Sequence, residues 1–338
     1  MKKNLFAILM IMLLMSAPGF TEKLATLPDL SKPTILAMDD TQFYVTEVAS
    51  VYIYSLEDFK LKKKFGKQGE GPQEFKLMGE FGLMVMPQED HLLINSIGRL
   101  SYFTKEGEYI KERNVKGAFT PGFHQPLGKG FVGLGNARDQ DSQSFFTTIN
   151  LYDENLKKTK EIYRQESFKG GRFEFPQPTP FFYAIENKII MGGEKEFVIN
   201  ILDAEANKTH SIKRDYKRVK VTEQYKERVH HLFKTHPLYK QGYEQIKKMI
   251  KFPDYFPAIL IHYVDNNKIY IVTYLEENEK YETFIYNTDG KFIKRVFLPI
   301  KYISVVQSNP LAFKDNKLYE LIENEETEEW EMHAFPIE

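Results

Sequence analysis

The sequence predicts an all-β protein, a six-bladed β-propeller of four-stranded blades, and three observations carry this prediction. First, six strands that end in a bulky residue recur along the chain. These anchors are Tyr54, Phe103, Tyr152, Leu202, Tyr286 and Phe335, with spacings of 49, 49, 50, 84 and 49 residues. A repeat of this length is typical of propeller blades. Second, short polar turns recur at similar offsets from the anchors. Third, the last repeat lacks a final strand.

The polar turns divide each repeat into strands. Before the anchors they lie at 39–41, 88–90, 128–130, 186–188, 265–268 and 315–317, and after three of the anchors at 105–107, 153–155 and 288–290. They are rich in Asn, Asp and Gly, which tolerate positive φ or bond to their own backbone. Alternating apolar runs separate the turns, so each repeat reads as four antiparallel strands.

The incomplete last repeat indicates how the ring closes. Only three residues follow Phe335, so the sixth blade has no fourth strand of its own. Residues 22–27 precede the first inner strand, expected at 35–38, and have no other place in the pattern. We expect this N-terminal strand to pair with the edge of the sixth blade, which removes an exposed edge and ties the two ends together.

The spacing of 84 between the fourth and fifth anchors contains an excess of 35 residues, at about 220–256. Apolar residues recur there at helical spacing on both sides of Pro237. They are Val221, Tyr225, Val229 and Leu232, then Tyr243, Ile246 and Ile250. The sequence therefore predicts a helical insert between blades 4 and 5. Antiparallel topology places it on the face of the second turn of each blade, at the mouth of the central channel.

The N-terminus reads as a cleaved signal peptide, residues 1–19, followed by one propeller domain over residues 20–338. Lys2 and Lys3 precede an apolar run, Leu5 to Met15, and then a segment of small residues. The run is shorter than the roughly 20 residues that span a bilayer, and no later segment is long and apolar enough to cross one. The chain contains no cysteine, hence no disulfide and no lipobox. We expect a periplasmic or secreted protein.

Charge is nearly balanced overall but uneven locally. Without Lys2 and Lys3, the chain has 44 basic and 47 acidic residues, a net charge of −3, which argues against nucleic acid as a partner. Residues 211–251 contain 12 bases and four acids, whereas residues 320–331 contain seven Glu and no base. Lys247, Lys248 and Lys251 are therefore candidate contacts for an envelope or extracellular partner. The alternative is a solvated helix face and an acidic blade edge.

The segment 65–75, FGKQGEGPQEF, follows the first repeat. It resembles the G-x-G-E-G-P-x-E-F connection of bacterial exported six-bladed β-propellers of the NHL-like and TolB-like groups, with Lys67 at a position that is often small. The resemblance implies an exported propeller with a binding or scaffold role and supplies no reaction. Its glycines favour a structural turn over a phosphate loop, because Pro72 and a second strand follow instead of a helix. Glu70 could bind a cation or cap backbone amides.

Polar side chains on the inner strands are the remaining candidates for a ligand site. His124, Tyr183, His262 and Gln307 lie on or beside predicted inner strands, and together with Glu70 they are the candidate ligand contacts. Ordinary solvation of the channel is the alternative for each of them.

No catalytic residue, metal site or cofactor is predicted. The sequence contains no recognisable Ser-His-Asp arrangement. The three histidines of the insert, His230, His231 and His236, do not share a helix face. We therefore favour a monomeric, non-catalytic module that recognises a protein or small ligand on the insert face. The alternative is a calcium-dependent, lactonase-like hydrolase with its active site in the channel.

Overall fold

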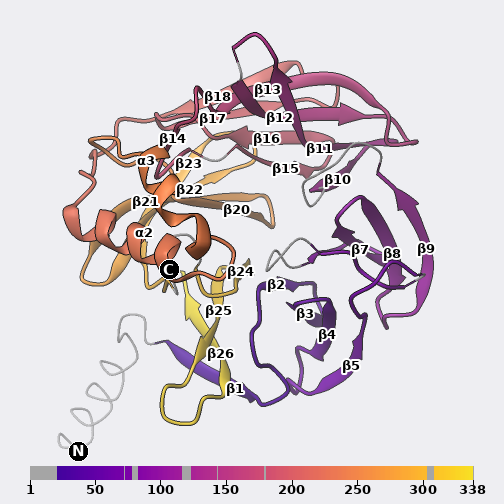
Figure 1. Cartoon of the computed structure of the whole chain (residues 1–338). Helices are drawn as coiled ribbons and strands as arrows, with labels where there is room; N and C mark the ends of the chain where they lie inside the picture. Colours follow the sequence, from indigo (N-terminus) through magenta and orange to yellow (C-terminus); the bar gives the residue numbers. More distant parts are fainter. Residues whose placement is uncertain are drawn as a thin grey trace, which may run out of the picture.

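The computed structural model describes residues 21–71, 73–77, 83–115, 123–142, 144–178, 180–302 and 308–337. Within these ranges, six four-stranded antiparallel sheets form a ring (Figure 1). The predicted six-bladed β-propeller is confirmed. The predicted signal peptide lies outside the described residues.

The first three blades follow the chain in order, from the innermost strand to the outermost. Blade 1 contains β2 (Ile35–Met38), β3 (Gln42–Glu47), β4 (Ser50–Ser55) and β5 (Leu61–Phe65). Blade 2 contains β6 (Met84–Pro87), β7 (His91–Ser96), β8 (Arg99–Thr104) and β9 (Tyr109–Asn114). Blade 3 contains β10 (His124–Leu127), β11 (Gly130–Asp139), β12 (Ser144–Tyr152) and β13 (Lys158–Phe168). The last three strands of blade 3 are longer than their counterparts in blades 1 and 2.

The other three blades complete the ring. Blade 4 contains β15 (Phe181–Ile185), β16 (Lys188–Gly192), β17 (Val198–Leu202) and β18 (Lys208–Lys213). Blade 5 contains β20 (Ile261–Asp265), β21 (Lys268–Glu277), β22 (Lys280–Asn287) and β23 (Phe292–Leu298). Blade 6 contains β24 (Leu311–Lys314), β25 (Lys317–Glu323), β26 (Trp330–Pro336) and, from the start of the chain, β1 (Glu22–Leu27).

The core lies between neighbouring blades. Each sheet is covered on both faces, so burial on the middle strands is not confined to alternate positions, and all six residues of β3 are buried, its polar Gln42, Thr46 and Glu47 included. Tyr44 and Val51 of blade 1, for example, belong to the same buried cluster as Leu92 and Ile94 of blade 2. The burial of both faces explains why these middle strands lack an exposed side.

The N-terminal strand closes the ring as predicted. β1 pairs antiparallel with β26, with Glu22 opposite Ala334 and Leu27 opposite Trp330. Leu27 is 1 % exposed. The indole N–H of Trp330 donates to the carbonyl of Ser31 at 3.0 Å, just beyond the strand. Ring closure therefore rests on backbone pairing and on buried apolar contacts together.

The predicted helical insert is present as α2 (Glu223–Thr235), the 3-10 turn η1 (Lys240–Gly242) and α3 (Tyr243–Met249). The hydroxyl of Thr222 accepts a hydrogen bond from the N–H of Tyr225 and caps α2. Three residues of α2, Tyr225, Val229 and Phe233, are buried against the rest of the insert. Figure 1 shows α2 in front of β21 and β22, beside the centre of the ring.

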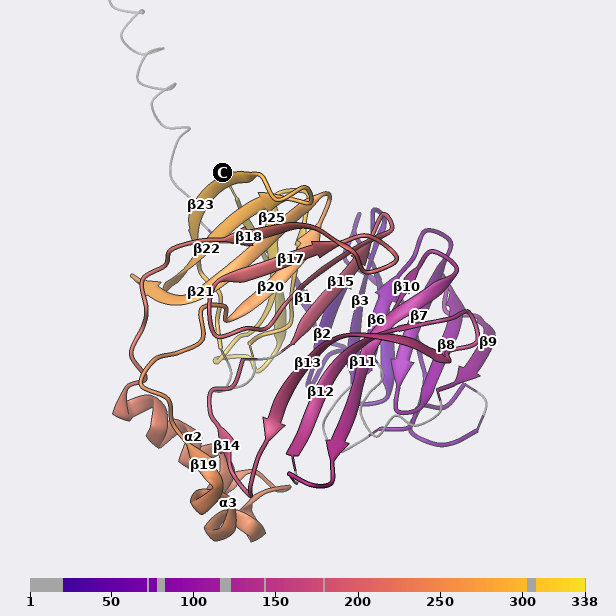
Figure 2. The same cartoon turned by 90° about the horizontal axis from the view of Figure 1, so that it is seen from above.

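A small parallel sheet joins the insert to the connection between blades 3 and 4. β14 (Phe173–Glu174) pairs with β19 (Ile250–Lys251), which directly follows α3. The N–H of Phe175 also donates to the carbonyl of Lys251 at 2.8 Å. Figure 2 shows the insert, β14 and the long strands of blade 3 projecting on the same face of the ring.

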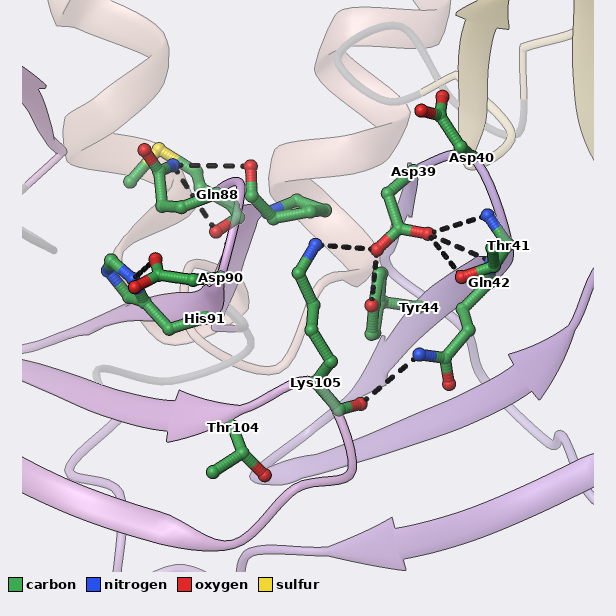
Figure 3. A network of polar contacts seen from close by, with 12 residues as sticks. Asp39, Asp40, Thr41, Gln42, Tyr44, Gln88, Asp90, His91, Thr104 and Lys105 are labelled. Carbon is green, nitrogen blue, oxygen red and sulfur yellow. Dashed lines mark hydrogen bonds and ion pairs between the residues drawn. The ribbon is translucent and has the colours of Figure 1, made fainter.

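A polar network on the first-turn side of the blades joins blades 1 and 2 (Figure 3). The carboxylate of Asp39 accepts hydrogen bonds from the Lys105 ammonium at 2.6 Å and from the Tyr44 hydroxyl at 2.7 Å. Burial opposes ionisation, but these hydrogen bonds outweigh it and lower the pKa of Asp39 to about 2. The pair is mostly enclosed by protein, so it acts as an inter-blade clamp.

The glycine-rich connection after blade 1 is a structural turn. A Cβ atom at Gly66, where φ is +88°, would lie 2.5 Å from the Phe75 ring. The carboxylate of Glu74 accepts a hydrogen bond from the N–H of Gly71 at 2.8 Å. The guanidinium of Arg99 donates to three carbonyls of the same connection, those of residues 70, 71 and 74. The motif therefore anchors a turn, and its glycines are explained by close packing.

Candidate functional site

The central channel brings two of the predicted ligand residues together. Tyr183 on β15 and His262 on β20 belong to the inner strands of neighbouring blades. The Tyr183 hydroxyl is 3.4 Å from the carbonyl oxygen of His262, to which it donates, and the two rings meet edge to face. The imidazole also stacks on Phe181. Both side chains are half-buried, so they keep contact with solvent although they lie inside the ring.

Burial keeps these channel groups uncharged. It lowers the pKa of His262 to about 3 and raises the pKa of Tyr183 and of its neighbour Tyr263. An imidazole with so low a pKa is neutral at pH 7 and is a weak general base there. The channel can therefore offer hydrogen bonds and aromatic faces to a neutral polar ligand, but this part of it does not supply an acid–base pair.

Two of the other three predicted ligand residues lie elsewhere, and the third is not among the described residues. His124 is on the inner strand β10, but its side chain is 0 % exposed and packs against Tyr152. Glu70 is in the connection after blade 1, where its exposed carboxylate pairs with Lys76 at 2.8 Å. Gln307 lies outside the described residues. His124 is also within contact distance of Gly133, which has no side chain to fill that space.

Sequence reasoning missed two buried acids, because it grouped Glu320 and Glu331 with an acidic blade edge. Glu320 on β25 is 4 % exposed and accepts a hydrogen bond from the N–H of Lys301 at 2.9 Å. Burial raises its pKa to about 7. Glu331, from the same acidic run, is buried too, whereas Glu325 and Glu326 are exposed as expected. The two buried acids lie on β25 and β26, whereas Glu325 and Glu326 lie in the turn between these strands.

The channel side chains among the described residues do not fit the calcium site of the hydrolase alternative. Asp265 is the one carboxylate on the six described inner strands. In the described part of the chain, no group of three or more His, Asp or Glu side chains is placed to hold a metal ion. Calcium takes six to eight oxygen ligands, so a single carboxylate is a poor start for such a site.

A second candidate site is a cleft of about 500 Å³ on the insert face, here called the insert-side cleft. One wall is the end of β13, and the others are β14, the turn between β16 and β17, and Lys251 of the insert. The lining residues are Tyr163, Gln165–Lys169, Arg172–Glu174, Gln177, Pro178, Gly193–Lys195 and Lys251. It is thus built where the long strands of blade 3 meet the helical insert.

A smaller cavity of about 270 Å³ adjoins the cleft and shares Glu174, Pro178 and Lys195 with it. Its other lining residues are Pro176, Glu196, Tyr216, Arg218 and residues 253–257. The ion pair between Lys195 and Glu174, at 2.7 Å, lies where the two cavities meet. The two cavities therefore form one groove between blade 4 and the insert.

The cleft carries more positive charge than its own acids neutralise. Glu174 pairs with Lys195, and Glu166 lies 3.6 Å from Lys169. Arg172 and Lys251 make no ion pair among the described residues, and both are exposed. Of the three predicted partner residues, Lys251 lines the cleft, whereas Lys247 and Lys248 are exposed on α3 and line neither cavity.

Comparison with known proteins supports the fold. No family model and no curated protein matches the chain. A structure of a protein from Bacteroides fragilis that is described as exported is similar, with a TM-score of 0.57 and 12 % identity over 95 % of each chain. A DUF4221 family member from Bacteroides vulgatus is similar too, with a TM-score of 0.53 and 15 % identity over 96 % of this chain and 97 % of that one. Within the described ranges, neither α-helix has the length and apolarity needed to cross a bilayer.

Proposed function

We propose that this chain is an extracytoplasmic, non-catalytic propeller that recognises a protein or small ligand on the face of the helical insert. The observation that carries the proposal is the insert-side cleft, where the two departures from regular blade geometry meet. Regular blades need neither an insert nor an extension of β13, and binding residues are concentrated on such additions to a rigid scaffold. His262 and Tyr183 in the channel are held neutral, which supports the non-catalytic part of the proposal.

The export part of the proposal rests on two observations of different kinds. The first 19 residues have the charged, apolar and small-residue parts of a signal peptide. A protein of similar fold is described as exported. The glycine-rich connection of residues 66–75 additionally supports a relationship to the NHL-like and TolB-like propellers, which we retain as part of the proposal.

The proposed contacts divide between the two regions. Lys251 would contact a partner in the insert-side cleft, and Lys247 and Lys248 would contact the same partner from the adjoining surface of α3. Tyr183 and His262 would contact a small ligand that enters the channel. The first set is charged and exposed, so it suits a solvated partner surface, whereas the second is neutral and half-buried.

Partner capture from an envelope extract tests the proposal. The immobilised chain is compared with a variant that carries K247E, K248E and K251E, and captured proteins are quantified by mass spectrometry. A matched control carries K62E, K208E and K291E, three exposed lysines on other parts of the ring. We expect the insert variant to lose a specific partner that the control retains. Equal capture by all three forms would reject recognition on the insert face.

A further inference from the structure

The outer edge of β13 faces the insert-side cleft. β13 is the last strand of its sheet, so one edge pairs with β12 and the other pairs with no strand of that sheet. Four consecutive residues at the end of β13, Gln165 to Phe168, line the cleft, and so does Lys169, whose backbone N–H and carbonyl are bonded to Arg172. Side chains alternate between the two faces of a strand, so a continuous run can line a cavity only if the strand edge itself faces it.

A side-chain contact shows that the backbone of this edge accepts hydrogen bonds from the cleft side. The amide of Gln177, another lining residue, donates to the main-chain carbonyl of Glu166 at 2.9 Å. Exposed strand edges pair readily with a further strand, and many peptide-binding domains use such an edge. At about 3.3 Å per residue, the four lining positions on β13 offer length for roughly four residues of an added strand, which would displace the Gln177 amide from the carbonyl of Glu166.

The charge of the cleft defines the chemistry of that strand. Arg172 and Lys251 border the cleft and have no acidic ion-pair partner in the described part of the chain. Among the lining acids, Glu194 is the one without a basic ion-pair partner there. A guanidinium binds a carboxylate through two parallel hydrogen bonds. An acidic side chain or a C-terminal carboxylate on the added strand would therefore complement Arg172 and Lys251.

We propose that the insert-side cleft binds an extended acidic peptide segment of a partner protein, which adds to the outer edge of β13 and places a carboxylate against Arg172 and Lys251. This deepens the proposed function and rests on it. Tyr163, Phe168 and Phe173 also line the cleft, and apolar side chains of the peptide would contact them.

Selection from a display library of random linear peptides tests the proposal on the full chain. We expect the selected sequences to be acidic and to lack central proline, which cannot complete a strand ladder. Synthetic copies are then titrated by fluorescence anisotropy. R172E and K251E should each weaken binding by about tenfold, because a close charge pair becomes a repulsion. K62E, an equal charge change on blade 1, should leave affinity unchanged.

Backbone methylation of the selected peptides separates strand pairing from simple charge attraction. Successive peptide N–H groups in a strand point to opposite sides, so methylation of one alternate set should abolish binding and methylation of the other should be tolerated. The proposal would be overturned if no binder is selected, or if R172E and K251E bind the peptides as tightly as the wild type does. It would also be overturned if the methylation series shows no alternation.

The outcomes also separate this inference from the proposed function. If the envelope partner depends on the insert lysines but no acidic peptide binds the cleft, the strand-addition inference fails and the binding module stands. If acidic peptides bind the cleft with the expected alternation but capture from the extract is insensitive to the triple variant, which includes K251E, the envelope partner is not captured through the insert face. The proposed function then fails, whereas peptide binding by the cleft stands.

Discussion

The central channel and the insert-side cleft both contain aromatic and titratable side chains. Charged forms are disfavoured by burial inside the ring, whereas they are solvated in the cleft. Inside the ring, burial lowers the pKa of His262 on the inner strand β20 to about 3 and raises that of Glu320 on β25 to about 7, so both groups are held toward their neutral forms. In the cleft, the side chains of Lys195 and Glu174 are 65 % and 40 % exposed, and water solvates their charges.

The difference follows from how each region is built. An ionised group inside the ring loses solvation that its hydrogen bonds, such as the one from the Lys301 N–H to Glu320, do not fully replace. The cleft is formed by additions on one face, and its charged groups need not be buried. The channel side chains therefore contribute mainly to the stability of the ring, whereas the cleft can exchange charged contacts with a partner at little cost in stability.

The largest expected effect concerns the ring on which both regions depend. Deleting residues 22–30 removes β1 and the buried side chains of Leu27 and Leu30. We expect the free energy of unfolding to fall by more than ~4 kcal/mol, since a buried leucine contributes roughly 2 kcal/mol. Urea denaturation measures the loss. Lys23→Ala, which removes one partly exposed ion pair with Glu331, should cost under ~1 kcal/mol. An unchanged midpoint for the deletion would contradict the closure of the ring by β1.

The next largest expected effect concerns Glu320. It tests whether a charged side chain buried in the ring lowers stability. The folded pKa of Glu320, about 7, lies above its ordinary value of 4.5. Its contribution to stability is therefore complete below pH 4.5 and is lost as the pH rises through 7. Glu320→Gln avoids this loss. Relative to the wild type, it should gain about 3 kcal/mol between pH 4.5 and pH 8, at roughly 1.4 kcal/mol per pKa unit.

Glu331 provides a control of opposite sign for that measurement. The hydrogen bond from Lys23 is the largest influence on its pKa, which falls to about 2. Its contribution is present above pH 4.5 and is lost as the pH falls toward 2. Glu331→Gln should therefore be destabilising at neutral pH and should approach the wild type in acid. Parallel pH profiles for the two variants would show that their environments do not differ as the structure indicates.

The fold could be predicted from the sequence because a propeller repeats. Each anchor and turn is a local signal, and the six copies support one another, so the blades, the closing strand and the insert follow from spacing alone. The cleft could not be predicted in this way. The anchors of blades 2, 3 and 4 are Phe103, Tyr152 and Leu202. They keep the ordinary spacing although β13 of blade 3 is 11 residues long. The pairing of β14 with β19 joins residues far apart in the chain.

The individual site residues were harder still. His124 and His262 both lie on inner strands, yet one is fully buried against a neighbouring strand and the other meets solvent in the channel. Which side chain points which way depends on strand register, and a shift of one residue exchanges the two faces. The sequence around Gly133 held a partial signal, because a glycine opposite His124 leaves room for the imidazole.

The smallest expected effect concerns the cleft. Arg172→Gln, Lys251→Gln and Glu194→Gln each remove an exposed charge that has no ion-pair partner in the described part of the chain. Each should change the free energy of unfolding by less than ~0.5 kcal/mol, as is usual for surface substitutions. Thermal and urea denaturation of the three variants measure this change. A loss above ~2 kcal/mol would mean that these charges hold blade 3, blade 4 and the insert together. The contrast with the channel would then disappear, because charge in the cleft would serve the fold and would not be available to a partner.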